Sequence, residues 1–272
     1  MSKGYFKLPW GDLHYRTAAC AGDRPVLFLL HQSPLSSETF EPMLPLLASW
    51  CRPYALDTPG YGASSPAPPA WEVADYAAAV WACADALGAE RVILFGRATG
   101  AVFALEAALL RPERTHRLIL HGLPVYTAAE RAERLAGFAP PIEPRADGSH
   151  LGQIWQRIAR EYPWMEPGLA TLLVRGYLAA GADFAAAYRA IWRHALAPRP
   201  LPVPTLLLSG TRDRLYYMHE RAVALLPQAE AEVFEGATDF IAWQEPARLE
   251  RRLAHFCAAH GSSRAARGVN HT

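Results

Sequence analysis

The sequence predicts an α/β fold: a mostly parallel central sheet with helices on both faces and one helical insertion. Strand-like apolar runs alternate with helical segments up to about residue 123 and again after residue 200. Residues 124–200 read as helices only, so the alternation is interrupted once. Because alternating strands and helices form βαβ units, whose strands are parallel, these observations indicate one sheet with one insertion.

The strand candidates are short runs rich in branched and aromatic residues. The first two flank a turn at Gly11 and Asp12, and the third reads PVLFLL. A run that is apolar throughout is typical of a strand buried on both faces. Strands are expected at residues 5–9, 13–17, 25–30, 53–56, 91–95, 116–120, 205–208 and 230–234.

The helix candidates divide into a core set and an inserted set. In doubly wound sheets ligands bind beyond the carboxyl ends of the strands, so an insertion at that edge would cover the site. The aromatic residues of the insertion either pack helix against helix or line an apolar pocket. Helices are expected at residues 36–48, 73–87, 99–110, 219–226 and 244–259 in the core, and at 127–137, 150–161, 167–180 and 183–195 in the insertion.

The predicted domain organisation follows from this division. Residues 1–123 and 201–260 form one discontinuous α/β core, and residues 124–200 form a helical cap. Residues 261–272 are small and polar, which is typical of a flexible tail.

Composition excludes several classes of protein. Hydrophobic residues make up 51% of the 272 residues and charged ones 19%, which excludes disorder. The 27 basic and 26 acidic residues give a net charge of +1, so no electrostatic reason exists to bind nucleic acid or an anionic membrane. Neither a membrane span nor a signal-peptide core is visible, and the four cysteines are scattered. We expect a cytoplasmic protein that binds a small organic molecule without a metal or other cofactor.

Chemistry-bearing motifs follow several of the predicted strands. The segment GRATG at residues 96–100 joins a strand to a helix, and such a sharp turn requires glycine. With HQSP at 31–34, DTPGYGAS at 57–64, GTRD at 210–213 and GATDF at 236–240, the chain resembles the α/β-hydrolase superfamily over residues 5–260. The five motifs occur in the order that the family has them. Cap helices often form dimer contacts in such folds, so a homodimer is a further expectation.

The resemblance implies that the usual catalytic triad is incomplete. The family's nucleophile falls on Ala98 and its histidine base on Asp239, while its acid matches Asp213. A serine mechanism needs a hydroxyl and an imidazole, and both are missing at these positions. The stretch from HQSPLSS through LDTPGYG to GRATGA also resembles a branch of the superfamily in which the turn reads HHTGA and carries no serine. This resemblance favours Ala98 as a natural divergence from the family's usual nucleophile.

The resemblance also implies an oxyanion hole made of backbone N–H groups. One donor would be Thr99, and the other would be Gln32 or Ser33. Such donors do not depend on side chains, so this half of the site would survive. In the family, the histidine at the position of His31 usually has a structural role and holds its loop. The alternative is that His31 acts as a base in place of the missing catalytic histidine.

Asp213 and Asp239 form the most informative pair, because the family places these positions in contact. Two touching carboxylates raise the pKa of one of them, which suits acid–base work near neutral pH. Alternatively, the two point apart, or an arginine such as Arg97 neutralises them. Arg97 could equally bind a substrate carboxylate. Candidate pocket walls are Tyr61, Tyr126, Tyr216 and Trp243.

These residues lead to one main hypothesis and two alternatives. The main hypothesis is an atypical enzyme that acts on a small apolar carbonyl or ester-like compound through oxyanion-hole and carboxylate acid–base chemistry. The first alternative is a non-catalytic protein that binds a small molecule. The second is a hydrolase inactivated by an engineered serine-to-alanine change at position 98. Asp239 argues against the last, because one engineered change would not explain two losses.

Overall fold

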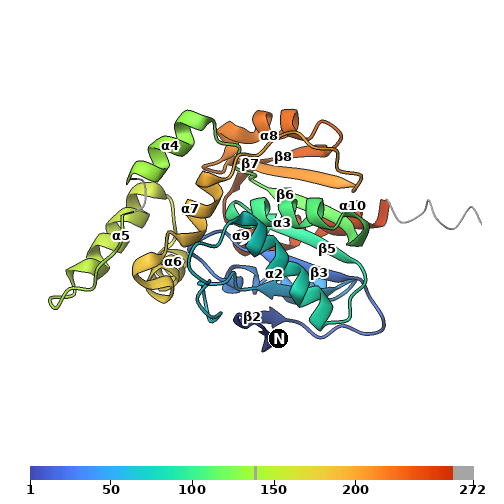
Figure 1. Cartoon of the computed structure of the whole chain (residues 1–272), viewed down its shortest axis with the longest axis horizontal. Coiled ribbons are helices and arrows are strands. Elements are labelled where there is room, and N and C mark those ends of the chain that lie inside the picture. The colour runs from blue at the N-terminus through green and yellow to red at the C-terminus, as the bar shows by residue number, and fades with distance from the viewer. Residues whose placement is uncertain (138–139, 260–272) are drawn as a thin grey trace, which may run out of the picture.

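The fold is built on one eight-stranded sheet, seen in a computed structural model that describes residues 1–137 and 140–259 (Figure 1). The strand order is β1-β2-β4-β3-β5-β6-β7-β8. β2 pairs antiparallel with β1 and β4, and the other neighbours pair parallel, which confirms the predicted fold class. The strands are β1 (Ser2–Leu8), β2 (Gly11–Thr17), β3 (Val26–Leu30), β4 (Arg52–Leu56), β5 (Val92–Arg97), β6 (Thr115–His121), β7 (Thr205–Arg212) and β8 (Glu230–Thr238).

Helices cover both faces of the sheet, which explains why the central strands are apolar throughout. Side chains alternate along β3, so Phe28 joins one apolar cluster and Leu29 the other. The Phe28 cluster includes residues of α2 (Val73–Ala86), α3 (Thr99–Leu110) and α8 (His219–Leu225). The Leu29 cluster includes residues of α1 (Leu44–Leu47), α9 (Ile241–Gln244) and α10 (Pro246–Ala259).

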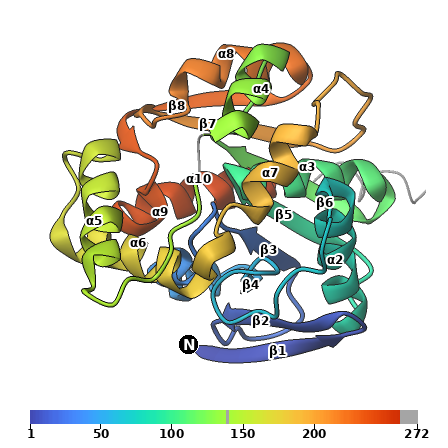
Figure 2. The ribbon, with the colours of Figure 1, turned by 60° about the vertical axis from the view of Figure 1, so that its left-hand side comes forward.

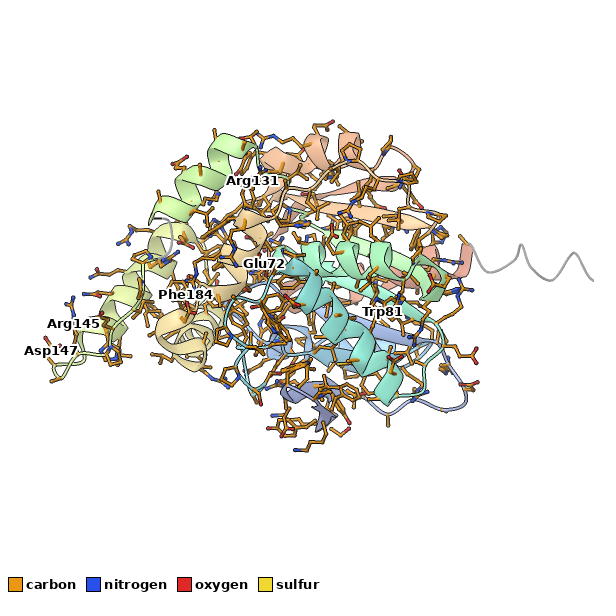
Figure 3. All side chains as sticks on the ribbon, viewed as in Figure 1. Glu72, Trp81, Arg131, Arg145, Asp147 and Phe184 are labelled. Atoms are coloured by element: carbon orange, nitrogen blue, oxygen red, sulfur yellow. The ribbon has the colours of Figure 1, made fainter. Side chains whose placement is uncertain are left out.

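Among the described residues, four α-helices between β6 and β7 lie together beyond one end of the sheet (Figures 1 and 2). These are α4 (Ala128–Gly137), α5 (Ser149–Glu161), α6 (Pro167–Ala180) and α7 (Ala186–Arg193), and we call them the cap. The cap has an apolar cluster of its own that contains Phe184 and also takes in Leu35 and Phe240 from the core. Figure 3 shows Phe184 on the core side of the cap and Arg145 at its outer tip.

Proline explains two differences from the predicted helices. The single helix expected at residues 36–48 is two short pieces, the 3-10 helix Ser37–Phe40 and α1, because Pro42 between them cannot donate a backbone hydrogen bond. The helix expected at 244–259 is divided into α9 and α10, and Pro246 is the first residue of α10. β8 also runs four residues further than expected, to Thr238, which places Asp239 directly at its carboxyl end.

Within the described residues, no single helix has both the length and the hydropathy that a membrane span needs. Residues 167–183 and 186–193 meet that test only as a pair, and they are bent by 74° at the break. The predicted tail at residues 261–272 lies outside the described residues.

Candidate functional site

The turn between β5 and α3 holds Ala98 in a strained conformation. Its φ is 50° and its ψ −113°, a region that alanine rarely adopts and that costs about 1–3 kcal/mol. The flanking glycines explain how the turn fits: a Cβ on Gly96 would lie 2.2 Å from the Gly100 carbonyl oxygen, and one on Gly100 would lie 2.3 Å from that of Leu30. The sequence therefore forces a sharp strand–turn–helix with Ala98 at its apex.

Ala98 lines a cleft of about 180 Å³ between the end of the sheet and the cap. The core contributes Gln32, Ser33, Arg97, Thr99 and Asp239; the segment from β6 through the cap contributes Pro124, Tyr126, Arg134, Arg157, Glu161, Tyr162, Tyr188, Ile191 and Trp192; and the loop after β7 contributes Arg214, Leu215 and Tyr217. The cleft thus brings together most of the predicted core site residues.

Arg97 forms a buried ion cluster with both aspartates. Its Nη2 lies 3.1 Å from Asp213 Oδ1 and 3.4 Å from Asp239 Oδ2. Its Nε donates to the Asp239 carbonyl at 3.2 Å, and Nη1 donates to the carbonyls of His121 and Gly122. Of the alternatives for Arg97, the geometry therefore matches pairing with buried acids, since each nitrogen of the guanidinium already contacts a protein oxygen.

Asp239 is the carboxyl group in the cleft whose protonation changes close to neutral pH. Burial, and then the charge of Asp213, raise its pKa to about 6, against the opposing effect of Arg97. His121 stays neutral, because burial and Arg97 lower its pKa to about 3. Its Nε2 lies 3.6 Å from Asp213 Oδ2, so an uncharged ring faces the second carboxylate.

The three residues expected to form an oxyanion hole all line the cleft, but their N–H groups differ. Ser33 N–H donates to the Thr99 hydroxyl oxygen at 2.7 Å, and that hydroxyl donates to Ser33 Oγ at 3.1 Å. Thr99 is the first residue of α3, so its N–H has no hydrogen-bond partner inside the helix. This N–H lies at the positive end of the helix dipole. The Tyr188 hydroxyl donates to the Ser33 carbonyl and ties α7 to this loop.

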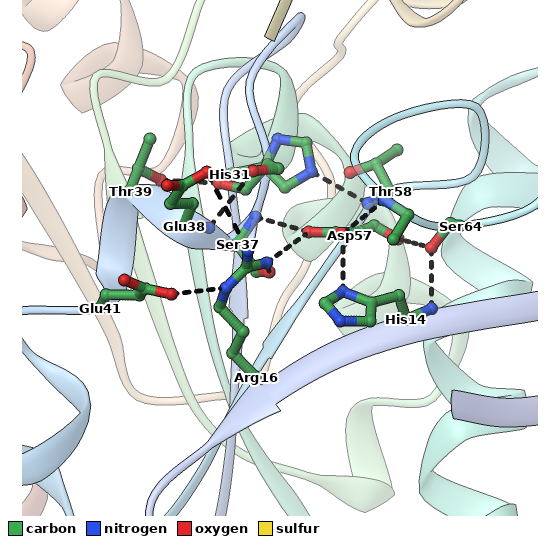
Figure 4. Close-up of polar contacts among 12 residues, drawn as sticks. His14, Arg16, His31, Ser37, Glu38, Thr39, Glu41, Asp57, Thr58 and Ser64 are labelled. Atoms are coloured by element: carbon green, nitrogen blue, oxygen red, sulfur yellow. Dashed lines mark hydrogen bonds and ion pairs between the residues drawn. The ribbon is translucent and has the colours of Figure 1, made fainter. Parts of the chain in front are cut away.

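His31 lies outside this cleft and holds two loops together (Figure 4). Its Nε2 accepts the Thr58 N–H at 2.9 Å, so Nδ1 carries the proton and donates to the Gln32 carbonyl at 3.0 Å. The ring is completely buried, and burial lowers its pKa. Both ring nitrogens of His31 are hydrogen-bonded, so the geometry matches a structural role for His31 and not the alternative role of a substitute base.

Asp57 organises the neighbouring loop through hydrogen bonds to both of its oxygens. Oδ1 accepts the Ser37 N–H at 2.6 Å, and Oδ2 lies 2.9 Å from the Ala63 N–H and 2.8 Å from His14 Nδ1. Burial disfavours the charge, but the hydrogen bond with His14 and those from Ser37 and Ala63 outweigh it and hold the pKa of Asp57 at about 2. Asp57 is therefore ionised and structural.

We expect Asp57→Asn to lower the free energy of unfolding by about 2–4 kcal/mol at pH 7, because a buried, fully hydrogen-bonded carboxylate is lost. The pKa of Asp57 is lowered on folding, so its contribution is present above its usual value of 3.8 and is lost as the pH falls through 2. Urea unfolding at pH 7 and pH 3 measures the loss, with the exposed Asp23→Asn as control. A loss under about 1 kcal/mol at pH 7 would contradict this role.

The four predicted wall residues lie in different places. Tyr126 lines the cleft, whereas the Tyr61 hydroxyl is buried and donates to the Phe184 carbonyl at 2.9 Å, which fastens the cap to the core. Tyr216 is 40% exposed and lies outside the cleft lining. Trp243 lines a smaller neighbouring cavity together with Asp239.

Sequence reasoning missed the charged residues that the cap brings to the cleft. Arg157 and Glu161 pair at 3.0 Å, and Glu161 also pairs with Arg214 at 2.7 Å. The available signal was the spacing of four between Arg157 and Glu161 on an amphipathic helix. Among the described residues, no three histidine, cysteine or acidic side chains gather as metal ligands would.

Comparisons with known proteins agree with the fold. A sequence model of the α/β-hydrolase fold matches residues 25–246. Carboxylesterase YbfK of Bacillus subtilis is 26% identical over 268 residues, covering 93% of this chain and 86% of that protein. A hydrolase structure from Pseudomonas aeruginosa has a TM-score of 0.78 at 21% identity and covers 93% of this chain and 97% of its own. An enol-lactonase structure from Burkholderia xenovorans LB400 has a TM-score of 0.74 at 19% identity, covering 94% and 100%.

Proposed function

The chain belongs to the α/β-hydrolase family, and we propose that it hydrolyses a small ester or related carbonyl compound without a covalent intermediate on the enzyme. The observation that carries the proposal is Asp239, a carboxyl group with a pKa of about 6 that lines the same cleft as Ala98. A base of that pKa accepts a proton from water near neutral pH. The similarity to an esterase, carboxylesterase YbfK, supports the choice of substrate class.

The proposed reaction uses water where the family uses a side-chain nucleophile. Ala98 offers only a methyl group, which leaves room for water beside the substrate carbonyl. Asp239 takes one proton from the water as its oxygen bonds to the carbonyl carbon. The negative charge that develops on the carbonyl oxygen is stabilised by the Thr99 N–H at the start of α3. Asp239 then returns its proton to the leaving alkoxide as the C–O bond breaks, which gives an acid and an alcohol.

The neighbours of Asp239 orient it and set its pKa. The Arg214 N–H donates to its Oδ1 at 3.3 Å, and Arg97 contacts its Oδ2. Asp213 contributes a second negative charge that disfavours ionisation of Asp239. Asp213 and Arg97 are thus positioning residues in this proposal, and Asp239 is the base.

A pH profile tests this assignment. We expect kcat/KM for activated short-chain esters to rise with pH through about 6 and then level off, because the ionised Asp239 is the active form. Asp213→Asn should move the rising limb to lower pH, since one cause of the raised pKa is removed. The rates are measured with p-nitrophenyl acetate and butyrate.

Protein with Asp239→Asn, purified identically, controls for contaminating esterases. Equal turnover by that variant, or a limb that Asp213→Asn leaves in place, would count against Asp239 as the base.

A second candidate function is ligand binding without turnover. The observation that favours it is the bond from Ser33 N–H to the Thr99 hydroxyl, which occupies one expected oxyanion donor within the protein. For this function no ester is hydrolysed, and Asp239→Asn changes only the affinity for a ligand. The four unpaired cysteines support a reducing, cytoplasmic location for either function.

A further inference from the structure

The described residues that line the cleft include four arginines but only two acidic side chains, Glu161 and Asp239. Arg157 and Arg214 share the two oxygens of Glu161, at 3.0 and 2.7 Å, so two cations are matched with one carboxylate. Arg134 of α4 adds a third cation to the lining. Arg97, by contrast, is matched with two aspartates, Asp213 and Asp239. The arginines in excess are therefore Arg134 and Arg157 of the cap and Arg214, which pairs with Glu161 of the cap. We call these three residues the cap-side wall.

Aromatic rings hold the three cap-side guanidinium groups in place. Arg134 lies over the ring of Tyr126 at 4.6 Å and Arg214 over that of Tyr162 at 4.8 Å. Arg157 lies 5.6 Å from the ring centre of Tyr177. A guanidinium stacked on a ring keeps its N–H groups directed in its own plane, which is the geometry that binds a carboxylate with two parallel hydrogen bonds.

Two large aromatic side chains add to the lining of the cleft. Tyr188 and Trp192 both line the cleft, and their rings are stacked with an interplanar angle of 8°. The cleft volume of about 180 Å³ suits a ligand with a single ring, since a cavity of roughly 150 Å³ accommodates benzene. The size of the cleft thus suits a ligand with one ring, and its arginines suit a ligand with a negative charge.

We propose that the cleft selects small planar carboxylates, aromatic or unsaturated, and holds their anionic group against the arginines of the cap-side wall. The inference rests on the proposed function, because it names the substrate class of the same cleft. The carbonyl to be attacked then lies toward Ala98 and Asp239, where a second negative charge on the ligand would meet Asp213. A monoanion with an ester or related carbonyl at its other end fits both the arginines of the cap-side wall and the carboxyl groups of Asp213 and Asp239.

Binding of three isosteric probes tests the inference without any need for turnover. Benzoate, benzamide and benzamidinium share one shape and carry charges of −1, 0 and +1. We expect benzoate to bind at least about tenfold more tightly than benzamide, and benzamidinium to bind most weakly, at low ionic strength. Titration calorimetry measures the affinities. A rise in salt concentration should weaken the binding of benzoate and not that of benzamide.

Variants of one helix locate the effect. Arg157→Gln should reduce the preference for benzoate over benzamide severalfold, whereas Glu161→Gln should increase it, because it removes the carboxylate that the arginines share. Arg160→Gln on the same helix is the matched control, since Arg160 is exposed, and it should leave the preference unchanged. The opposite signs expected for the first two variants separate an electrostatic effect from general damage to the fold.

Several outcomes would overturn the inference. These are equal binding of benzamide and benzoate, no binding of any probe at millimolar concentration, or the same loss with Arg160→Gln as with Arg157→Gln. A benzoate preference in a protein that hydrolyses no ester would leave this inference standing and refute the proposed reaction. Ester hydrolysis with the expected pH profile but no preference for anions would do the reverse.

Discussion

Arg97→Met is expected to lower the free energy of unfolding at pH 7 by about 3–5 kcal/mol, the largest loss of stability expected from any single change in the site. The guanidinium is the cation placed between Asp213 and Asp239, both of which are buried. Methionine is an unbranched apolar side chain that fills part of the same space. The loss in the free energy of unfolding would therefore report mainly on two buried carboxylates left without their counter-ion. Urea unfolding at pH 7 gives the value.

The pH dependence of that loss identifies its cause. Arg97 lowers the pKa of Asp239, so its removal should raise that pKa above the present value of about 6. A carboxyl group whose pKa is raised on folding stabilises the protein below its unfolded pKa of 3.8, and that stability is lost as the pH rises through the folded value. The deficit of Arg97→Met should therefore be smaller at pH 5 than at pH 7.

The double variant Arg97→Met/Asp239→Asn completes the test. It should recover part of the lost stability, because one of the two uncompensated charges is removed. Arg97→Lys keeps the charge but loses the planar fork that reaches several oxygens, and it should fall between the wild type and Arg97→Met. A deficit of the same size at both pH values, with no recovery in the double variant, would mean that packing and not charge explains the effect.

The architecture could be predicted from the sequence because it depends on local patterns. Continuous apolar runs such as residues 26–30 require burial on both faces, and this alone indicates a parallel sheet covered by helices. The glycines at 96 and 100 require a sharp turn wherever the chain goes next. Pro42 was equally visible in the sequence and explains the break in the first predicted helix.

The charges of the site could be predicted only in part. The closeness of Asp213 and Asp239 follows from the resemblance, because the family places these positions in contact. In the structure the two residues follow β7 and β8, which are neighbouring strands of the sheet. The partner of Arg97 stayed open, since a long side chain at a strand end can turn toward the ligand or toward the acids. Arg157 and Arg214 come from segments more than 50 residues apart, and only the packing of the cap brings both to Glu161.

Asp239→Asn is expected to lower kcat for ester hydrolysis by a factor of about 10²–10⁴, the usual contribution of a general base. Asparagine keeps the shape of the side chain and can still accept the Arg214 N–H, but it cannot take a proton from water. KM should change little, because the proposed contacts with the substrate are made by other groups. Steady-state kinetics at pH 7.5 measures both quantities.

The same substitution should make the protein more stable at pH 7.5, because burial and the charge of Asp213 raise the pKa of Asp239 and so disfavour its ionised form in the folded state. Thermal unfolding of the wild type and the variant at pH 7.5 and pH 4 measures the difference, which should disappear at pH 4, where Asp239 is protonated. A group retained only for packing would show no such gain. Lost turnover together with gained stability would therefore mean that the charge of Asp239 is kept for chemistry, whereas a loss of both would assign it a structural role and favour a protein that only binds its ligand.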